Sequence, residues 1–311
     1  MTTPRMTPLP TSSHRSTASL GSALGPGPGP GDGSSFVMTR APAGMSPVAA
    51  ILLVLIAVGG RVLLDLQLGT AAGEVWQRSV EVLTALVTGA VVFHFASDDP
   101  PRLPWTLFFV SMVIVPLVRL LSYLHVEAGG VAIAYVLLII GNFFLAGTLV
   151  AFGRVLGSSE LLSERTRDDR LRATAFVATL ALGAVATLAY NTFEVAERGL
   201  PTTLGAWVAA TANLVSTLCD AFAFAGSLYL VWLVRPLIGG LLARPYILIA
   251  AAAGVFLAVD ILLVAAGAIV QTDLVATSIT SLLPKWLGCL AYTCLALAAG
   301  SQLALLRSLR H

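Results

Sequence analysis

The chain has 311 residues, of which 57% are apolar and only 11% charged, and its formal net charge is +2. Ordinary soluble domains contain roughly 45–50% apolar and 25% charged residues. A soluble globule of this length could not hide so much apolar surface, and no separate soluble domain is long enough to bind nucleic acid. The composition therefore predicts an integral membrane protein that has the lipid bilayer as its main partner and binds no nucleic acid.

Residues 1–46 differ in kind from the rest of the chain. The segment TSSHRSTASLGSALGPGPGPGDGSS from Thr11 to Ser35 is rich in Ser, Thr, Gly and Pro. Such a mixture cannot bury enough apolar area to offset its conformational entropy. We expect a disordered tail, and Met38 or Met45 would serve equally well as the first residue of the protein.

Eight later stretches are long and apolar enough to cross the hydrocarbon layer, which needs about 20 helical residues for roughly 30 Å. Lipid cannot satisfy open backbone groups, and the stretches lack the alternation of barrel strands, so we expect α-helices and no strands. The fold class predicted is an all-α polytopic membrane protein with eight transmembrane helices. The expected spans lie near residues 48–67, 80–97, 104–123, 130–153, 173–194, 206–233, 246–270 and 286–306.

Two of these stretches end in nearly the same sequence, AGTLVAFGRVL from Ala146 and AGSQLALLRSL from Ala299. Each copy closes the fourth of four apolar stretches, which indicates two four-helix repeats. Four spans per half make both halves enter the membrane from the same face, so the repeats are parallel. The expected organisation is a tail at 1–46, a first repeat at 47–156, a charged linker at 157–172 and a second repeat at 173–311.

The basic residues predict the orientation, because Lys and Arg accumulate in short cytoplasmic loops. With eight spans, thirteen of the 18 Lys and Arg residues fall on the side of the N-terminus. The other side holds only Arg78, Arg198 and Lys285. We therefore expect a multi-pass protein of the cell (inner or plasma) membrane with both termini, the tail and the linker in the cytoplasm.

Charged residues inside the predicted spans are the first candidates for function. Aligning the third spans of the two halves on Pro104 and Pro245 sets Arg119 against Asp260. Each charge follows its proline by fifteen residues, or about 22 Å of helix, so both are expected at the same depth. An unpaired charge in hydrocarbon is costly, so we expect Arg119 and Asp260 to meet between the repeats, either as a structural pair or in a solute or proton site.

Asp220 lies near the middle of the sixth span, too far from either end to reach water. Asn213, Ser216 and Ser227 fall on the same helical face as Asp220, as does Thr217. This polar stripe is typical of a helix that lines a solute or ion pathway, although an internal structural bond would account for it too.

Two further candidates lie near the outer ends of their spans. Arg61 and Asp65 are four residues apart in the first span, a spacing that suits a local ion pair or contact with headgroups. Glu194 closes a stripe of polar residues in the fifth span. Both features are consistent with a polar interior.

Catalytic and cofactor motifs are lacking: there is no H-E-x-x-H sequence and no G-x-S-x-G turn. We expect no metal and no bound cofactor. The first hypothesis is a secondary transporter or permease for a small solute or ion, with its polar site between the repeats. The second is a non-catalytic sensor or assembly subunit with a membrane partner, in which the buried charges are structural. The third is a lipid-directed membrane enzyme that uses Asp220 or Glu194 as an acid or base.

Overall fold

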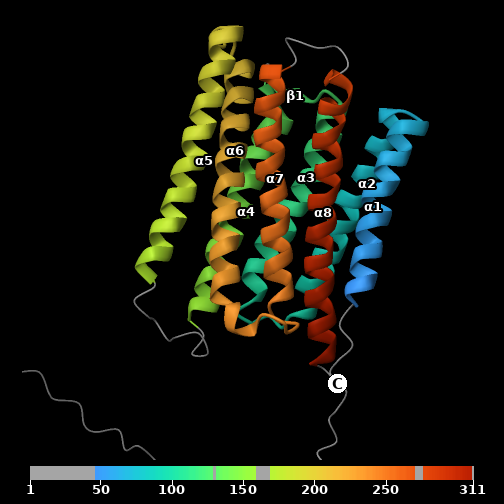
Figure 1. Ribbon diagram of the computed structural model, residues 1–311, viewed down its shortest axis with the longest axis vertical. Coiled ribbons are helices and arrows are strands. Elements are labelled where there is room, and N and C mark those ends of the chain that lie inside the picture. Colours follow the sequence, from blue (N-terminus) through green and yellow to red (C-terminus); the bar gives the residue numbers. More distant parts are fainter. Residues whose placement is uncertain (1–45, 129–130, 159–168, 270–275, 310–311) are drawn as a thin grey trace, which may run out of the picture. The chain divides into compact units, whose positions relative to one another are not determined.

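The computed structural model describes residues 46–128, 131–158, 169–269 and 276–309, all within one compact unit. The predicted tail lies outside the described residues except for Ser46, as does most of the linker. Within the described ranges the chain forms eight α-helices that run roughly side by side (Figure 1). They are α1 (Pro47–Gln67), α2 (Thr70–His94), α3 (Arg102–Tyr123), α4 (Ile133–Gly157), α5 (Asp169–Arg198), α6 (Leu204–Leu233), α7 (Arg244–Ile269) and α8 (Ala276–Ser308).

Local sequence signals explain several helix ends. Ser46 caps α1 by accepting a hydrogen bond from the Ala49 amide at 3.1 Å, and Pro47 follows as the first helical residue. Gly69 takes a φ of 87°, a left-handed conformation that favours glycine, and so allows the short turn into α2. The amide of Ala206 donates to the Thr203 side chain at 3.2 Å at the start of α6.

The expectation of no strands is wrong in one small place. β1 (Glu127–Ala128) and β2 (Val131–Ala132) form an antiparallel pair before α4, with Glu127 opposite Ala132. A short 3-10 helix, η2 (Arg235–Leu237), follows α6. The apolar stretch near 130–153 therefore begins as a strand, because the first residues of that stretch complete a hairpin before the helix starts.

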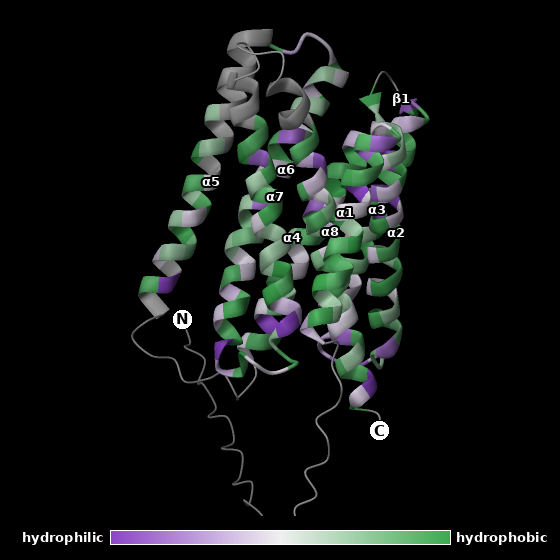
Figure 2. Ribbon diagram, turned by 45° about the vertical axis from the view of Figure 1, so that its right-hand side comes forward, coloured by the Kyte–Doolittle hydropathy of each residue, from purple (hydrophilic) through white to green (hydrophobic). Residues whose placement is uncertain are grey.

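Six helical segments in the described part of the chain are long and apolar enough to cross a membrane. Their outward surfaces are apolar, as the hydropathy colouring of Figure 2 shows. In α1, for example, Val48, Ile51 and Leu55 are all well exposed. Exposure on this scale is typical of a surface solvated by lipid, so the chain is a multi-pass membrane protein. The six segments are Pro47–Gln67, Arg102–Tyr123, Ile133–Gly157, Leu204–Leu233, Arg244–Leu263 and Leu282–Ser308.

Helix α8 lies inside the bundle, where it packs against α1, α2 and α7. The buried residues of α8 are mostly small, including Cys289, Ala291 and Ala298, which lets neighbouring helices approach closely. On the other side of the core α4 packs against α3 and α6. Edge-to-face aromatic contacts join α3, α4 and α7 there: Trp105 meets Phe152 at 5.5 Å between ring centroids, and Phe152 meets Tyr246 at 5.5 Å.

Candidate functional site

A buried ion pair lies in α1 at the face that meets α2 and α8. The Nε of Arg61 donates to Oδ2 of Asp65 at 2.8 Å, and both side chains are completely buried. The indole Nε1 of Trp286 in α8 donates to the same carboxylate oxygen at 2.8 Å. The spacing of four residues therefore does produce a local pair, but the pair faces the bundle interior and not the headgroups.

Two glycines allow α1 and α2 to approach closely beside this pair. A Cβ at Gly73 in α2 would overlap the Asp65 carboxylate and lie 2.8 Å from Nε of Arg61. A Cβ at Gly60 in α1 would lie 2.8 Å from the ring of Trp76. The Trp76 indole donates across the same contact to the Ala57 carbonyl at 2.7 Å. The close approach of α1 and α2 thus depends on positions without a side chain.

Several polar atoms of this region have no hydrogen-bond partner within the described part of the chain. They are both terminal nitrogens of Arg61, Oδ1 of Asp65 and Oε2 of Glu81. Glu81 in α2 is only 2% exposed, and its other oxygen accepts from Gln77 at 3.2 Å. We call Arg61, Asp65, Glu81 and Trp286 the ion-pair cluster.

Glu81 did not emerge from the sequence as a candidate. The second span was expected to begin at residue 80, which put Glu81 at a membrane boundary, whereas α2 begins ten residues earlier at Thr70. The signal that identifies it is a polar residue at nearly every turn of α2, at Gln77, Glu81, Thr84 and Thr88, on the face that becomes buried.

A second polar centre lies between α6 and α7. The Asp220 and Asp260 carboxyl groups lie close enough to interact. Thr217 lies beside Asp260, and its hydroxyl donates to the Asn213 carbonyl at 3.2 Å. Oδ2 of Asp260 is buried and has no hydrogen-bond partner among the described residues. We call Asp220 and Asp260 the carboxyl pair.

Arg119 does not meet Asp260, contrary to the expectation from the aligned repeats. Arg119 is exposed, and no ion pair joins it to Asp260 although both side chains are described. Its charge acts instead on Glu81 and Tyr292. The alignment predicts only an equal depth for the two residues. Helix α3 packs against α2 and α4, whereas α7 packs against α6 and α8, so Arg119 and Asp260 have different neighbours.

The predicted stripe on α6 is only partly enclosed. Asn213 is exposed, Ser216 and Asp220 are half-buried, and Ser227 is completely buried with its hydroxyl bonded to the Phe224 carbonyl at 2.8 Å. The stripe therefore runs from the lipid or solvent boundary into the bundle. Glu194 belongs to α5, but its side chain lies outside the described residues.

Tyr292 of α8 lies between the two polar centres. Glu81 and Asp220 both act electrostatically on its phenol. The Thr84 hydroxyl of α2 shares its proton between the Val80 carbonyl at 2.8 Å and the Tyr292 carbonyl at 3.1 Å, and the second contact joins α2 to α8 at this level. The ion-pair cluster of α1, α2 and α8, Tyr292 of α8, and the carboxyl pair of α6 and α7 are thus neighbouring polar groups within the bundle.

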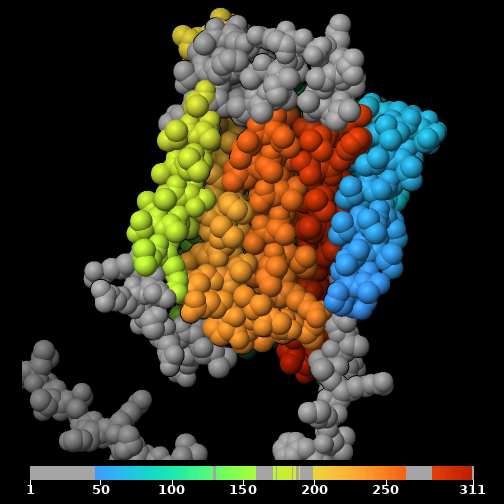
Figure 3. All heavy atoms as spheres, in the orientation of Figure 1, coloured from blue at the N-terminus to red at the C-terminus, as the bar shows by residue number. Residues whose placement is uncertain are grey.

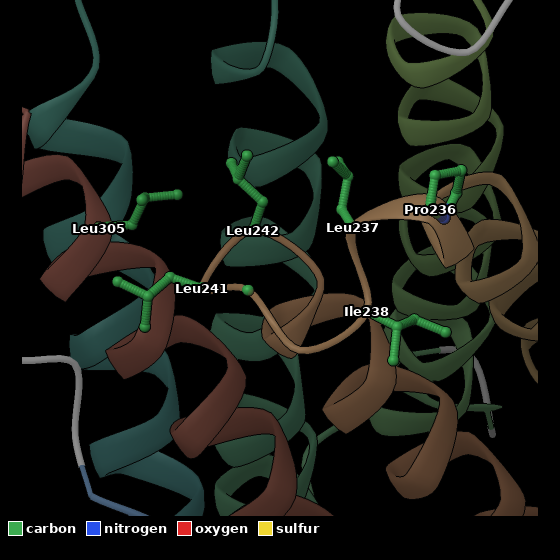
Figure 4. A pocket seen from close by; sticks show the side chains of 7 residues that line it. Pro236, Leu237, Ile238, Leu241, Leu242 and Leu305 are labelled. Carbon is green, nitrogen blue, oxygen red and sulfur yellow. The ribbon is translucent and has the colours of Figure 1, made fainter. Parts of the chain in front are cut away.

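Concave pockets lie away from these charges. A pocket of about 460 Å³ near the end of α8 is lined by Leu237, Leu241, Leu242, Leu305 and neighbouring apolar residues (Figure 4). It offers no titratable side chain. Among the described residues, no group of three or more His, Cys, Asp or Glu side chains is placed to hold a metal ion.

Comparison with known proteins adds no family to this geometry. No protein-family model, curated protein or solved structure matches the chain. The site offers a pair of carboxyl groups inside a membrane bundle and a separate, enclosed ion pair.

Proposed function

We propose that the protein is a secondary transporter or permease for a small solute or ion, and that the carboxyl pair of Asp220 and Asp260 takes up and releases a proton. The observation that carries the proposal is the close approach of these two carboxyl groups, one from α6 and one from α7. Acidic groups within membrane helices commonly mark ion pathways and proton relays.

The chemistry of the pair follows from its geometry. A hydrogen bond between two carboxyl groups needs a proton on one of them, because two ionised carboxylates only accept. Two like charges in close contact cannot both persist where solvation is poor. The pair therefore holds one proton in its bonded form, and losing that proton drives Asp220 and Asp260 apart. A change in the proton would thus alter the contact between α6 and α7.

Alternating access would come from two parallel four-helix repeats, 47–156 and 173–311, that rock against each other. Equivalent packing in the two halves supports this organisation. In the first half α2 packs on α3 and α3 on α4; in the second α6 packs on α7 and α7 on α8. Across the halves α4 packs on α6, as α8 packs on α2. A twofold axis along the membrane normal that relates the two repeats would produce this pattern of helix contacts.

All eight helices would then span the bilayer, including α2 and α5. Helix α2 is 25 residues long and packs against α3 and α8, and its polar residues Glu81, Thr84 and Thr88 are buried. These three buried side chains lower the mean hydropathy of α2, but they do not contact lipid. The basic residues favour both termini in the cytoplasm of a cell membrane.

A thiol-accessibility experiment tests the water path that transport requires. The three native cysteines, Cys219, Cys289 and Cys294, are replaced, and a single cysteine is placed at Ser216 beside the carboxyl pair. In reconstituted vesicles, a membrane-impermeant thiol reagent is expected to label the cysteine that replaces Ser216. Ser227, which is completely buried, serves as the protected control. If the cysteine at position 216 is protected under all conditions while a cysteine in an exposed loop reacts, the result contradicts the proposed water path.

A second measurement addresses the proton directly. Infrared difference spectra of the wild-type protein during a pH titration are expected to contain a protonated carboxyl band that Asp220→Asn removes. Glu74→Gln, at a half-exposed position, is the matched control and should leave the band unchanged. Transport itself is measured as solute-dependent charge movement in vesicles. We expect this movement with the wild-type protein and none with Asp220→Asn. A spectrum without any such band would contradict the proposal.

The ion-pair cluster supports a second candidate, a membrane sensor or assembly subunit. The Arg61 and Asp65 side chains are completely buried, and the partly buried Trp286 ties them to α8, as a purely structural element would. In that case Asp220→Asn would change the melting temperature or the abundance of the protein. The carboxyl pair of the wild-type protein would exchange no protons with water. The measurements above separate the two functions.

A further inference from the structure

A groove between α4, α5 and α6 is distinct from both polar centres. It has a volume of about 270 Å³, and its walls include Leu149 and Gly153 of α4, Phe176 of α5, and Phe222 and Tyr229 of α6. Sites that enclose a drug-sized ligand usually measure roughly 300–1,000 Å³. A narrower apolar groove suits a single alkyl chain better than a compact polar solute.

The groove opens at the side of the bundle. The part of α5 nearest Asp169 diverges from α6 in Figure 1, and the space-filling view of Figure 3 is hollowed between these helices. Farther along, the two helices come close where Gly183 meets Ala221. An apolar opening on a membrane-embedded surface is filled by lipid chains, because no water is available to fill it.

Basic and aromatic groups gather at the same end of the groove. Arg154, in the last turn of α4, lines the groove, is exposed and makes no ion pair within the described ranges. One turn before Phe176 on α5, the guanidinium of Arg172 lies 4.1 Å from the ring centroid of Trp232. Trp232 in turn lies beside Tyr229, with 5.7 Å between ring centroids. Tyrosine and tryptophan favour the headgroup region, so this end suits a membrane interface.

We propose that this groove binds an anionic phospholipid, with one acyl chain between α4, α5 and α6 and the phosphate at Arg154 on the side of Arg172. The charge of the two arginines complements the phosphate, and the aromatic rings suit the glycerol and upper chain region. Basic pockets between membrane helices commonly bind anionic headgroups. This lipid site does not depend on the proposed transport.

Retention of defined lipids by the purified full-length protein tests the proposal. The delipidated protein is titrated with phosphatidylglycerol or phosphatidylcholine, and bound lipid is counted by native mass spectrometry. We expect the wild-type protein to prefer phosphatidylglycerol. Arg154→Gln should weaken its retention about fivefold, corresponding to about 1 kcal/mol for one basic residue near a phosphate. Arg78→Gln, which changes a half-exposed arginine of α2 outside the groove, is the matched control.

A second pair of variants tests the acyl chain. A Cβ at Gly153 would meet only Tyr229, at 3.9 Å, so Gly153→Leu fills the groove without a clash at that atom. Gly157→Leu, in the same helix with open space around it, is the control. Gly153→Leu should reduce retention of both lipids while melting stays close to wild type.

Equal retention of the two lipids by the wild-type protein would overturn the proposal, as would unchanged phosphatidylglycerol binding in Arg154→Gln. If Gly153→Leu instead releases a co-purifying helix or a second copy of the chain with no change in lipid, the groove is a protein interface. That outcome would also overturn the proposal.

Discussion

The ion pair of Arg61 and Asp65 allows a quantitative test of the packing around α1. The two side chains are completely buried, their atoms are 2.8 Å apart, and Trp286 adds a third group to the same oxygen. Removing one partner of a buried pair typically costs about 3–5 kcal/mol, because the remaining charge is left without compensation. Both terminal nitrogens of Arg61 already lack a partner among the described residues, so little else can stabilise that charge.

We therefore expect Arg61→Met and Asp65→Asn each to lower the free energy of unfolding by about 3–5 kcal/mol, with Asp65→Asn nearer the lower figure because its amide oxygen still accepts one bond. The double variant should cost no more than the worse single variant, since no buried charge of the pair remains. Reversible unfolding in mixed micelles, followed by tryptophan fluorescence, measures all three changes.

Glu74 provides the control for an exposed pair. Its carboxylate lies 3.7 Å from Arg78 and 3.3 Å from Lys285, and the side chains are 38–46% exposed. Glu74→Gln should cost less than about 1 kcal/mol, because surface pairs contribute little. If Asp65→Asn costs as little as Glu74→Gln, or if the two changes at the ion pair are simply additive, the reasoning is refuted.

Three further predictions concern packing and can be measured by the same unfolding assay. Gly73→Ala should destabilise the protein by about 1–3 kcal/mol, because the new methyl group overlaps the ion pair, whereas Gly59→Ala has open space and should be close to neutral. Thr84→Val removes the bond to the Tyr292 carbonyl and should cost about 0.6 kcal/mol, the average for hydrogen bonds between membrane helices, and at most about 1.7 kcal/mol; no loss would mean that the bond contributes nothing. Trp105→Ala should cost about 3–5 kcal/mol, because the ring is completely buried against two phenylalanines, and a cost below 1 kcal/mol would contradict that packing.

The sequence alone identifies the class of protein and most helices, since hydropathy is a property of consecutive residues. It also indicates the Arg61–Asp65 pair, because residues four apart on one helix are neighbours whatever surrounds them. Hydropathy does not locate the start of α2. Residues 70–79 include charged side chains, which lower the hydropathy of the segment, yet the segment forms the first part of the helix. Glu81 was missed for that reason.

Tertiary structure decides which helix face meets which neighbour, and a linear pattern does not contain that information. Arg119 and Asp260 occupy equivalent places in the aligned stretches, yet the partner of Asp260 is Asp220 on the adjacent helix. Trp286 joins Asp65 across 221 positions of the chain. Helix rotation and the order of packing, set by small residues such as Gly73 and by many weak contacts, bring these groups together. The sequence determined that polar groups would lie within the membrane; only the packing of the helices decided how they are paired.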